Sequence, residues 1–248
     1  MSPLAEKNHK ESPYLRMQRE LGALIEHAPA GSKLPNEPDL ATQMGVSRST
    51  LREAMRSFET QGQLIRRQGV GTFVVGKSGV FETGMEVLES LESIAERLKL
   101  KIRMGVSELD NIPADERLAR TFKVRKGTTL LRVSRVMHAE GRSIAYLQDI
   151  LPREVLSPKD LEQGFTGSVL DLLIRRGNPR PEHSHTEINA VPAPSHVARA
   201  LEIQRGDVLL MFEADLFGLD GKVIDHSRSF FLPGFFRFHV LRKISVLK

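Results

Sequence analysis

The sequence of 248 residues has no cysteine and no tryptophan, and only 6% of its residues are aromatic. Without cysteine it can form no disulfide, no thiolate nucleophile and no cysteine-ligated zinc site. It has no apolar run near the roughly 20 residues that a membrane-spanning helix needs. Its first residues, MSPLAEKNHKES, contain no apolar segment of the kind found in secretory signals. These absences predict a cytoplasmic protein without a membrane anchor.

A large excess of charge of either sign is also missing. The 36 lysines and arginines exceed the 31 aspartates and glutamates by five, which gives a net charge of +5. This charge permits an anionic partner such as nucleic acid, but many basic proteins bind none. The length allows one large domain or two smaller ones, and we expect two.

The first 75 residues show the pattern of three helices followed by a hairpin. Apolar residues at helical spacing predict an amphipathic helix over residues 13–27, which the stretch APAGSKLP ends. Asn36 is the expected N-cap of a short second helix, and Gly45 ends that helix. Ser47 is the expected N-cap of a third helix that runs to about Gln61. The stretch LIRRQGVGTFVV, with its glycine turn, predicts a hairpin.

Three arginines recur every fourth residue on the predicted third helix. Arg48, Arg52 and Arg56 lie beside an apolar face and form a stripe directed toward solvent. A short helix, a tight turn and a helix with an exposed basic stripe is the helix-turn-helix arrangement, whose second helix enters the DNA major groove. A solvated helix face is the alternative. The glycine turn before the stripe and the sequence RRQGVG after it favour DNA binding.

Residues 34–74, LPNEPDLATQMGVSRSTLREAMRSFETQGQLIRRQGVGTFV, resemble the winged helix-turn-helix of the GntR family of bacterial transcriptional regulators. The resemblance implies that Arg48 and Arg52 contact operator DNA and that the wing tip approaches the minor groove. Pro38 replaces an arginine that contacts DNA in the family, so lower affinity or a different operator should follow. The expected DNA-contacting residues are Ser47, Arg48, Ser49, Thr50, Arg52, Arg56, Arg66, Arg67, Gln68, Gly69 and Gly71.

The remaining sequence predicts a second, α+β domain. GKSGVFETG is a glycine-rich junction, and a helical apolar stripe follows it over residues 85–100. Six β-rich runs come next, several of them joined by turn signals such as Glu140-Gly141 and Asp220-Gly221, with three short helices between them. We therefore expect a DNA-binding domain over residues 10–76, a linker over 77–84 and an antiparallel-sheet domain over 85–248.

This second domain resembles the UTRA domain, the effector-binding module of the HutC branch of GntR regulators. The resemblance rests on the order of elements and on the stretches LLRVSRVMHAEGRSIAYLQDILP, GSVLDLL and LFGLDGKVIDHSRSFF. It implies a fold like that of chorismate lyase, with a ligand held between the sheet and helices. Many relatives bind sugar phosphates or small acids, so the resemblance implies a small-molecule effector, in many cases an anionic metabolite.

Three positions of this domain match effector contacts of the family, and each has a structural alternative. Arg135 would grip an anionic group, or else form an internal salt bridge with Glu187 or Asp225. Ser168 would bind an anion at a helix start or serve as a plain N-cap. Asp225 would accept ligand hydroxyls or be an exposed strand acid. The expected effector-binding residues are Arg135, Ser168, Asp225, Glu187 and Tyr146.

Two departures from the family remove charge from this site. Met137 stands where the family has a second arginine, and Leu147 stands where it has an acid. We hypothesise that the effector is less highly charged, or more apolar, than a sugar phosphate. His183, His185 and Glu187 alternate on one predicted strand, but three such residues are weak evidence for a metal, and a polar sheet face is the favoured interpretation. No cofactor is expected.

Together these patterns predict a ligand-controlled transcription regulator, in most cases of this family a repressor. We expect a homodimer on a roughly palindromic operator in double-stranded DNA. An enzyme of chorismate-lyase-like fold is one alternative, although the sequence has no nucleophile elbow and no phosphate-binding loop before a helix. A DNA-binding architectural protein without an effector is the other.

Overall fold

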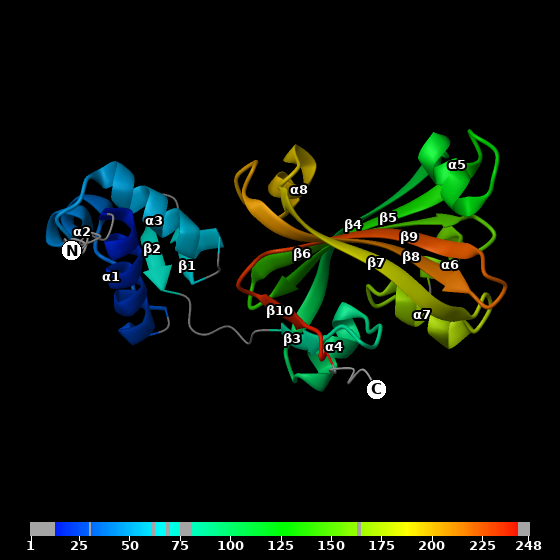
Figure 1. Cartoon of the computed structure of the whole chain (residues 1–248), viewed down its shortest axis with the longest axis horizontal. Coiled ribbons are helices and arrows are strands. Elements are labelled where there is room, and N and C mark those ends of the chain that lie inside the picture. The colour runs from blue at the N-terminus through cyan, green and yellow to red at the C-terminus, as the bar shows by residue number, and fades with distance from the viewer. Residues whose placement is uncertain are drawn as a thin grey trace, which may run out of the picture. The chain divides into compact units, whose positions relative to one another are not determined.

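The structure is a computed structural model that describes residues 13–29, 31–60, 63–67, 70–74, 81–162 and 165–242. The chain forms two compact units, residues 1–78 and 79–248 (Figure 1). Each unit has its own buried apolar clusters. Two independent cores are what a chain of this length and composition can support.

The N-terminal unit begins with three helices, α1 (Pro13–His27), α2 (Glu37–Gln43) and α3 (Arg48–Thr60). The predicted caps are confirmed, since Asn36 Oδ1 accepts a hydrogen bond from the Asp39 amide at 2.9 Å and Ser47 Oγ accepts one from the Thr50 amide at 3.1 Å. Gly45 has a φ of +62°, which lets the chain turn sharply between α2 and α3. The apolar faces of the helices meet in one core, which includes Met17, Leu21, Leu40, Leu51, Ala54, Met55 and Phe58.

The predicted hairpin consists of β1 (Leu64–Arg67) and β2 (Gly71–Val74), which pair antiparallel. The extended residues before α2 add to this hairpin. The Leu34 amide donates to the Thr72 carbonyl, and the Val74 amide donates to the Ser32 carbonyl, both at 2.8 Å. These bonds satisfy backbone groups on the outer side of β2 and attach the wing to the helical part of the unit.

The C-terminal unit is built on a six-stranded antiparallel sheet of order β4-β5-β6-β9-β8-β7. Its strands are β4 (Ile102–Pro113), β5 (Thr129–Ala139), β6 (Arg142–Pro152), β7 (Pro181–Pro192), β8 (Val208–Gly218) and β9 (Val223–Phe231). The predicted turn at Glu140-Gly141 is confirmed, because both residues have positive φ, +50° and +77°. This conformation suits a tight hairpin.

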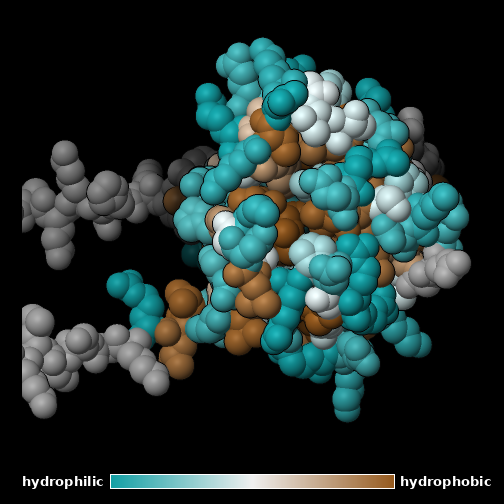
Figure 2. Space-filling model, turned by 90° about the vertical axis from the view of Figure 1, so that its right-hand side faces the viewer, coloured by the Kyte–Doolittle hydropathy of each residue, from teal (hydrophilic) through white to brown (hydrophobic). Residues whose placement is uncertain are grey.

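Helices cover both faces of this sheet. α4 (Leu91–Arg97), α6 (Pro158–Glu162) and α7 (Val169–Arg176) lie on one side, and α5 (Glu116–Phe122) and α8 (Ser195–Ala200) lie on the other (Figure 1). Because side chains alternate along a strand, Leu131 and Val133 of β5 pack with Leu173 of α7, whereas Leu130 packs with α5. On the surface in Figure 2, hydrophobic residues lie mostly in hollows between hydrophilic side chains.

Two strands of this unit form a separate parallel pair, β3 (Phe81–Gly84) with β10 (Phe236–His239). Residues 81–84 were expected in the linker. The predicted helix over residues 85–100 is also too long, because α4 begins only after Ser90, whose Oγ accepts from the Ser93 amide at 2.9 Å. Residues 85–90 follow an irregular path, and this path positions part of the site described below.

Candidate functional site

The exposed face of α3 carries the predicted arginine stripe. Arg48, Arg52 and Arg56 are all exposed, while Leu51 between them is fully buried. Rotation of 100° per residue produces this separation of a basic and an apolar face. The structure therefore presents cationic side chains on the helix that the helix-turn-helix arrangement would place in a major groove.

Glu37, at the first turn of α2, links this stripe to the wing. Its Oε2 accepts hydrogen bonds from Arg52 Nε at 3.1 Å and Nη2 at 2.8 Å, and its Oε1 accepts from Arg66 Nη2. The bond from Arg52 is the main reason that the pKa of the Glu37 carboxyl lies below its usual range. The sequence indicated Glu37 only as a first-turn acid, because its two partners lie 15 and 29 residues away.

Glu37→Gln should therefore destabilise the N-terminal unit by about 1 kcal/mol or less, since both arginines are about half exposed and solvent screens the pairs. A lowered folded pKa contributes stability above the unfolded pKa, and this stability is lost as pH falls through the folded pKa. The cost of the substitution should thus be present at pH 7 and be lost as pH falls below 4.5 and through the lowered folded pKa of Glu37. Urea unfolding at pH 7 and at low pH measures it, with exposed Glu26→Gln as control; a cost that persists at low pH contradicts the ion-pair explanation.

The wing presents Arg66, and its base includes a further cation. A Cβ built on Gly71, whose φ is +134°, would lie 2.5 Å from Lys33 Cε, so glycine at this position allows the Lys33 side chain to lie against the wing. Arg67 is in β1, opposite Gly71. Gln68 and Gly69 lie outside the described residues. Lys33 is a candidate DNA contact that the sequence analysis missed.

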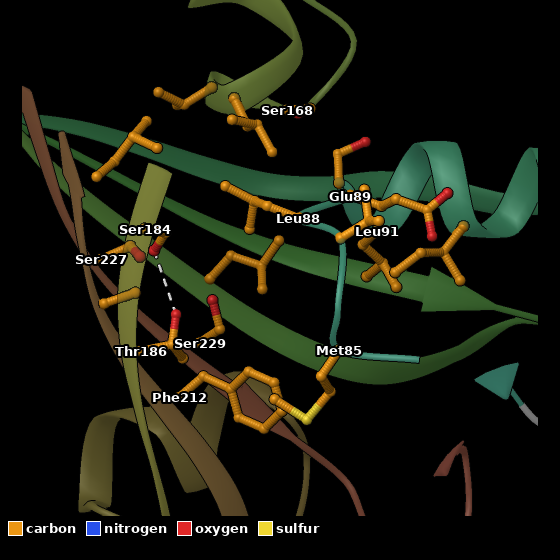
Figure 3. Close-up of a pocket in the computed structure, with 18 of the residues that line it drawn as sticks. Met85, Leu88, Glu89, Leu91, Ser168, Ser184, Thr186, Phe212, Ser227 and Ser229 are labelled. Carbon is orange, nitrogen blue, oxygen red and sulfur yellow. Dashed lines mark hydrogen bonds between the residues drawn. The ribbon is translucent and has the colours of Figure 1, made fainter. Parts of the chain in front are cut away.

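The C-terminal unit contains a pocket of about 690 Å³ between the sheet and the α4 and α7 side of the unit. Figure 3 shows Met85, Leu88 and Leu91 on one side of it, and hydroxyl side chains of the sheet on the other. Three of the five predicted effector residues line it: Arg135, Ser168 and Asp225. They are far apart in sequence: Arg135 lies on β5, Asp225 lies on β9, and Ser168 lies at the start of α7, while β6 separates β5 from β9 in the sheet.

Arg135 is only 3% exposed and forms a buried ion pair with Asp149 of the neighbouring strand. An internal partner was the predicted alternative for Arg135, but Glu187 and Asp225 were the partners considered. Asp149 is the acid that sequence reasoning missed. Its signal was a single charged residue in the mostly apolar stretch LQDILP, two residues from Leu147 and so on the same sheet face.

Asp225 and Glu92 are two further carboxyl side chains that line the pocket. Burial, followed by the negative charge of Asp149, raises the pKa of the Asp225 carboxyl well above its usual range. Burial likewise raises the pKa of Glu92. Asp225 is 5% exposed, so it is not the exposed strand acid of the alternative interpretation.

Ser168 serves as the N-cap of α7 as well as lining the pocket. Its Oγ accepts a hydrogen bond from the Asp171 amide at 2.9 Å. The Asp171 carboxylate in turn accepts a bond from Ser90 Oγ at 2.6 Å, which ties the start of α4 to the start of α7. Ser168 is therefore an N-cap, as in the alternative interpretation, and it also lines the pocket.

Hydroxyl groups line the sheet side of the pocket. Thr186, Ala214 and Ser227 lie opposite one another on β7, β8 and β9, so the small alanine separates two hydroxyl residues. Ser184 Oγ and Thr186 Oγ1 are 3.2 Å apart, and Ser229 follows Ser227 on the same face (Figure 3). This surface can donate and accept several hydrogen bonds to a polar ligand.

Two predicted effector residues, Tyr146 and Glu187, are not among the residues that line this pocket. Tyr146 alternates with Leu147, so it points to the opposite sheet face, where its ring packs against His196 of α8. Glu187 alternates with Thr186 and is exposed on β7. The prediction that Tyr146 and Glu187 contact the effector is therefore wrong for this pocket. Side chains alternate between the two faces of a strand, and these two lie on the face away from the pocket.

Comparison with known proteins assigns both parts of the chain to known families. Residues 14–74 match the bacterial regulatory proteins of the gntR family, and residues 97–237, more than half of the chain, match the UTRA domain. The chain belongs to the GntR family and carries a UTRA domain. The resemblance inferred from the sequence is thereby confirmed.

Known relatives of this GntR regulator include named repressors. It is 29% identical over 203 residues to the histidine utilization repressor of Pseudomonas aeruginosa, covering 80% of this chain and 78% of the relative. It is 26% identical over 247 residues to the transcriptional repressor NagR of Bacillus subtilis, covering 96% and 99% of the two chains. The crystal structure of PhnF from Mycobacterium smegmatis has the same fold, with a TM-score of 0.62 at 21% identity over 92% of this chain and 100% of that one.

The GntR regulator is therefore a ligand-responsive transcription regulator and not an enzyme. Family membership decides between a transcription regulator and an enzyme of chorismate-lyase-like fold. Its winged helix-turn-helix binds operator DNA, and its UTRA domain binds a small-molecule effector. Within the described ranges, none of its helices has the length and apolar character needed to cross a membrane.

The histidines considered for a metal site have other surroundings in the regulator. His183 stacks on Phe217 with ring centroids 4.8 Å apart, and its Nδ1 lies 3.2 Å from the Glu182 carboxylate. Over the part of the chain that the structure describes, no three histidine, cysteine or acidic side chains form a group suited to a metal ion. His185 is exposed on the same strand, β7.

From the raised pKa of the Asp225 carboxyl we predict how the stability of the folded chain depends on pH. Ionisation of this carboxyl favours the unfolded chain, so Asp225 costs stability that grows as pH rises from its unfolded value of 3.8 toward its folded pKa. Asp225→Asn cannot ionise and can still donate to Asp149. We expect the variant to be more stable than the wild type at pH 8 and its advantage to shrink toward pH 4, as measured by urea unfolding.

Asp220→Asn is the matched control for this experiment. Asp220 lies on the same hairpin and is exposed, and the Lys222 side chain and amide hold its carboxyl pKa below the usual range. Its substitution should therefore cost stability at pH 8, the opposite sign to Asp225→Asn. A stability gain for Asp225→Asn that is independent of pH would refute the buried-carboxyl explanation.

Proposed function

We propose that this regulator is a cytoplasmic homodimeric repressor that binds a roughly palindromic operator and releases it when a small molecule fills the UTRA pocket. The observation that carries the proposal is a set of unsatisfied atoms. Glu92 Oε1, Arg135 Nε and Asp225 Oδ1 are buried and have no hydrogen-bond partner among the residues that the structure describes. Unsatisfied buried polar atoms are costly, and a ligand in the pocket would satisfy them.

The DNA side of the proposal rests on α3 and the wing. Ser47 caps α3, and Arg48, Ser49 and Arg52 occupy its first turns, where side chains of a recognition helix reach bases and phosphates. A two-fold dimer would place two such helices on half-sites related by the same symmetry. The two repressors to which the chain is similar support repression as its mode of control.

The pocket wall supplies a route from effector to DNA-binding domain. Residues 83–92 line the pocket in one continuous stretch, and they follow the junction of the two units closely in sequence. A ligand that contacts this stretch would act directly on the end of β3 (Phe81–Gly84), the first described element after that junction. Such coupling requires that the effector bind the DNA-competent and DNA-released states with different affinity.

Selection of bound duplexes from a random pool by the full-length protein tests the proposal. The selected sequence should contain an inverted repeat, and sedimentation should give a dimer on one duplex. Fluorescence anisotropy with this operator then measures release by individual metabolites. A compound that fills the pocket and leaves operator affinity unchanged excludes regulation by that compound, and selection of no preferred sequence contradicts operator binding.

A further inference from the structure

The charge of the pocket is strongly unbalanced. Among the described residues, its lining contains one arginine, Arg135, one histidine, His183, and no lysine, together with six carboxyl side chains: Glu86, Glu89, Glu92, Asp149, Glu182 and Asp225. Arg135 is already paired with Asp149 in the interior. Glu89 is bound at the rim by Arg97, with 2.6 Å between Oε2 and Nη2. Among the described residues that line the pocket, no arginine or lysine is therefore without an acidic partner.

Most of the unsatisfied atoms in the pocket are hydrogen-bond acceptors. Two of the three are carboxylate oxygens, Glu92 Oε1 and Asp225 Oδ1, and the third is Arg135 Nε, which is a donor. Carboxylate oxygens accept hydrogen bonds, so the pocket needs more donors than acceptors from its ligand. Arg135 and Asp225 are each at least nine-tenths buried, so water does not supply these partners freely.

Glu92 and Asp225 belong to one electrostatic cluster. Each of them interacts with both Arg135 and Asp149, so three carboxyl groups surround one guanidinium. When all four groups are ionised the cluster is negative, and its burial makes that charge unfavourable. A cationic ligand would balance the cluster, whereas a phosphate dianion would add to the repulsion.

We propose that the effector carries a protonated nitrogen, held by the carboxyl groups of Glu92 and Asp225 beside the Arg135–Asp149 pair. The proposal rests on the proposed function, because it names the chemical class that the effector pocket takes. The hydroxyls of Thr186, Ser227 and Ser229 then receive the polar body of the ligand. This assignment replaces the anionic metabolite that Arg135 indicated from sequence.

The Glu92 carboxylate lies against Gly167, the residue before the N-cap of α7. A Cβ built on Gly167, whose φ is +118°, would lie 2.6 Å from Glu92 Oε1. The glycine thus leaves room for the carboxylate close to the start of α7. Glu96 lies one turn further along α4 and is exposed, outside the pocket lining, so it provides a matched control on the same helix.

The first test uses thermal denaturation of the full-length protein with a panel of protonated amines, neutral polyols and phosphate esters. The panel includes D-glucosamine, D-glucose and D-glucose 6-phosphate, which share a scaffold and differ in charge. We expect the largest stabilisation from amines, and glucosamine should raise Tm more than the other two sugars. Equal or larger stabilisation by polyols or phosphate esters overturns the assignment of a protonated nitrogen.

The second test uses Glu92→Gln and Glu96→Gln with the best amine of the panel. Loss of a charge-assisted hydrogen bond should weaken binding to Glu92→Gln by about tenfold or more. Glu96→Gln should bind as the wild type does, and unchanged binding by Glu92→Gln overturns the role of Glu92. Operator release separates the two proposals. An effector that lacks a protonated nitrogen defeats only this inference, whereas the absence of any stabilising or releasing compound defeats the proposed function as well.

Discussion

Replacing Arg48 and Arg52 together by alanine should reduce operator affinity by about 30-fold to 10⁴-fold, if each makes a bidentate base contact of roughly 1–3 kcal/mol. Both side chains are exposed on α3, so the substitutions remove no core contact. Alanine is also the best helix former, and α3 should stay folded. This is the largest effect on DNA binding that we expect from the N-terminal unit.

Salt dependence distinguishes base contacts from phosphate contacts in this experiment. Each lost phosphate contact should lower the slope of log K against log salt by about 0.9, whereas a lost base contact changes affinity with little change of slope. Fluorescence anisotropy of a labelled operator from about 0.05 to 0.2 M salt gives both quantities. Arg16→Ala with Arg19→Ala, on exposed positions of α1, controls for the loss of two charges. Unchanged affinity of the α3 variant at physiological salt would contradict the DNA-contact assignment.

The pairing of Arg52 with Glu37 makes this prediction more specific. A guanidinium has five N–H donors, and Arg52 uses its Nε and Nη2 for Glu37, so the Nη1 donors are not used by this pair. Lysine cannot hold a carboxylate and a base edge in the same planar geometry. Arg52→Lys should therefore recover little of the affinity that Arg52→Ala loses, although it keeps the charge.

Removal of the Arg135 side chain should produce the largest loss of stability. Arg135→Ala leaves Asp149, which is 7% exposed, without its cation in the interior of the C-terminal unit. Breaking a buried ion pair in this way costs about 3–5 kcal/mol. Urea unfolding followed by far-ultraviolet circular dichroism should show an earlier transition of this unit, while the N-terminal unit, which has its own core, should change little.

The double variant Arg135→Met with Asp149→Leu separates two contributions to the free energy of unfolding. One is the cost of an unpaired buried charge, and the other is the net contribution of the ion pair. Apolar replacements of a buried pair are often neutral or stabilising, so the double variant should be more stable than Arg135→Ala by several kcal/mol, about 3 or more. It should also lose effector binding, because the pair lies in the pocket lining. A double variant as unstable as Arg135→Ala would show that packing, and not the unpaired carboxylate, sets the cost.

Local patterns predicted most of the fold. The three helices and the hairpin of the N-terminal unit follow from helical spacing, the caps at Asn36 and Ser47, and the turn at Gly45. The six strands of the large sheet follow from β-rich runs and from turn signals such as Glu140-Gly141. Such signals act within a few residues, so they survive in any tertiary context that the chain adopts.

Other features arise only from contacts between distant residues. The parallel pair of β3 with β10 joins Phe81 to Phe236, and no local signal marks four-residue strands that pair across the unit. Residues 85–90 have helical spacing, yet they line a pocket instead, because the Ser90 cap and the bond to Asp171 start α4 later. Tertiary contacts override local propensity in both places.

The amino-acid sequence by itself determined the two-domain organisation that we proposed, the basic stripe on α3 and membership of a family of regulators. These rest on residue type and spacing, which folding does not alter. Only the tertiary structure decided that Arg135 is paired with Asp149, that Glu37 holds Arg52 and Arg66, and that Tyr146 points away from the pocket. The physical reason is that the role of a charged side chain depends on the partners that folding brings within a few ångströms. Spacing along the sequence does not predict these partners.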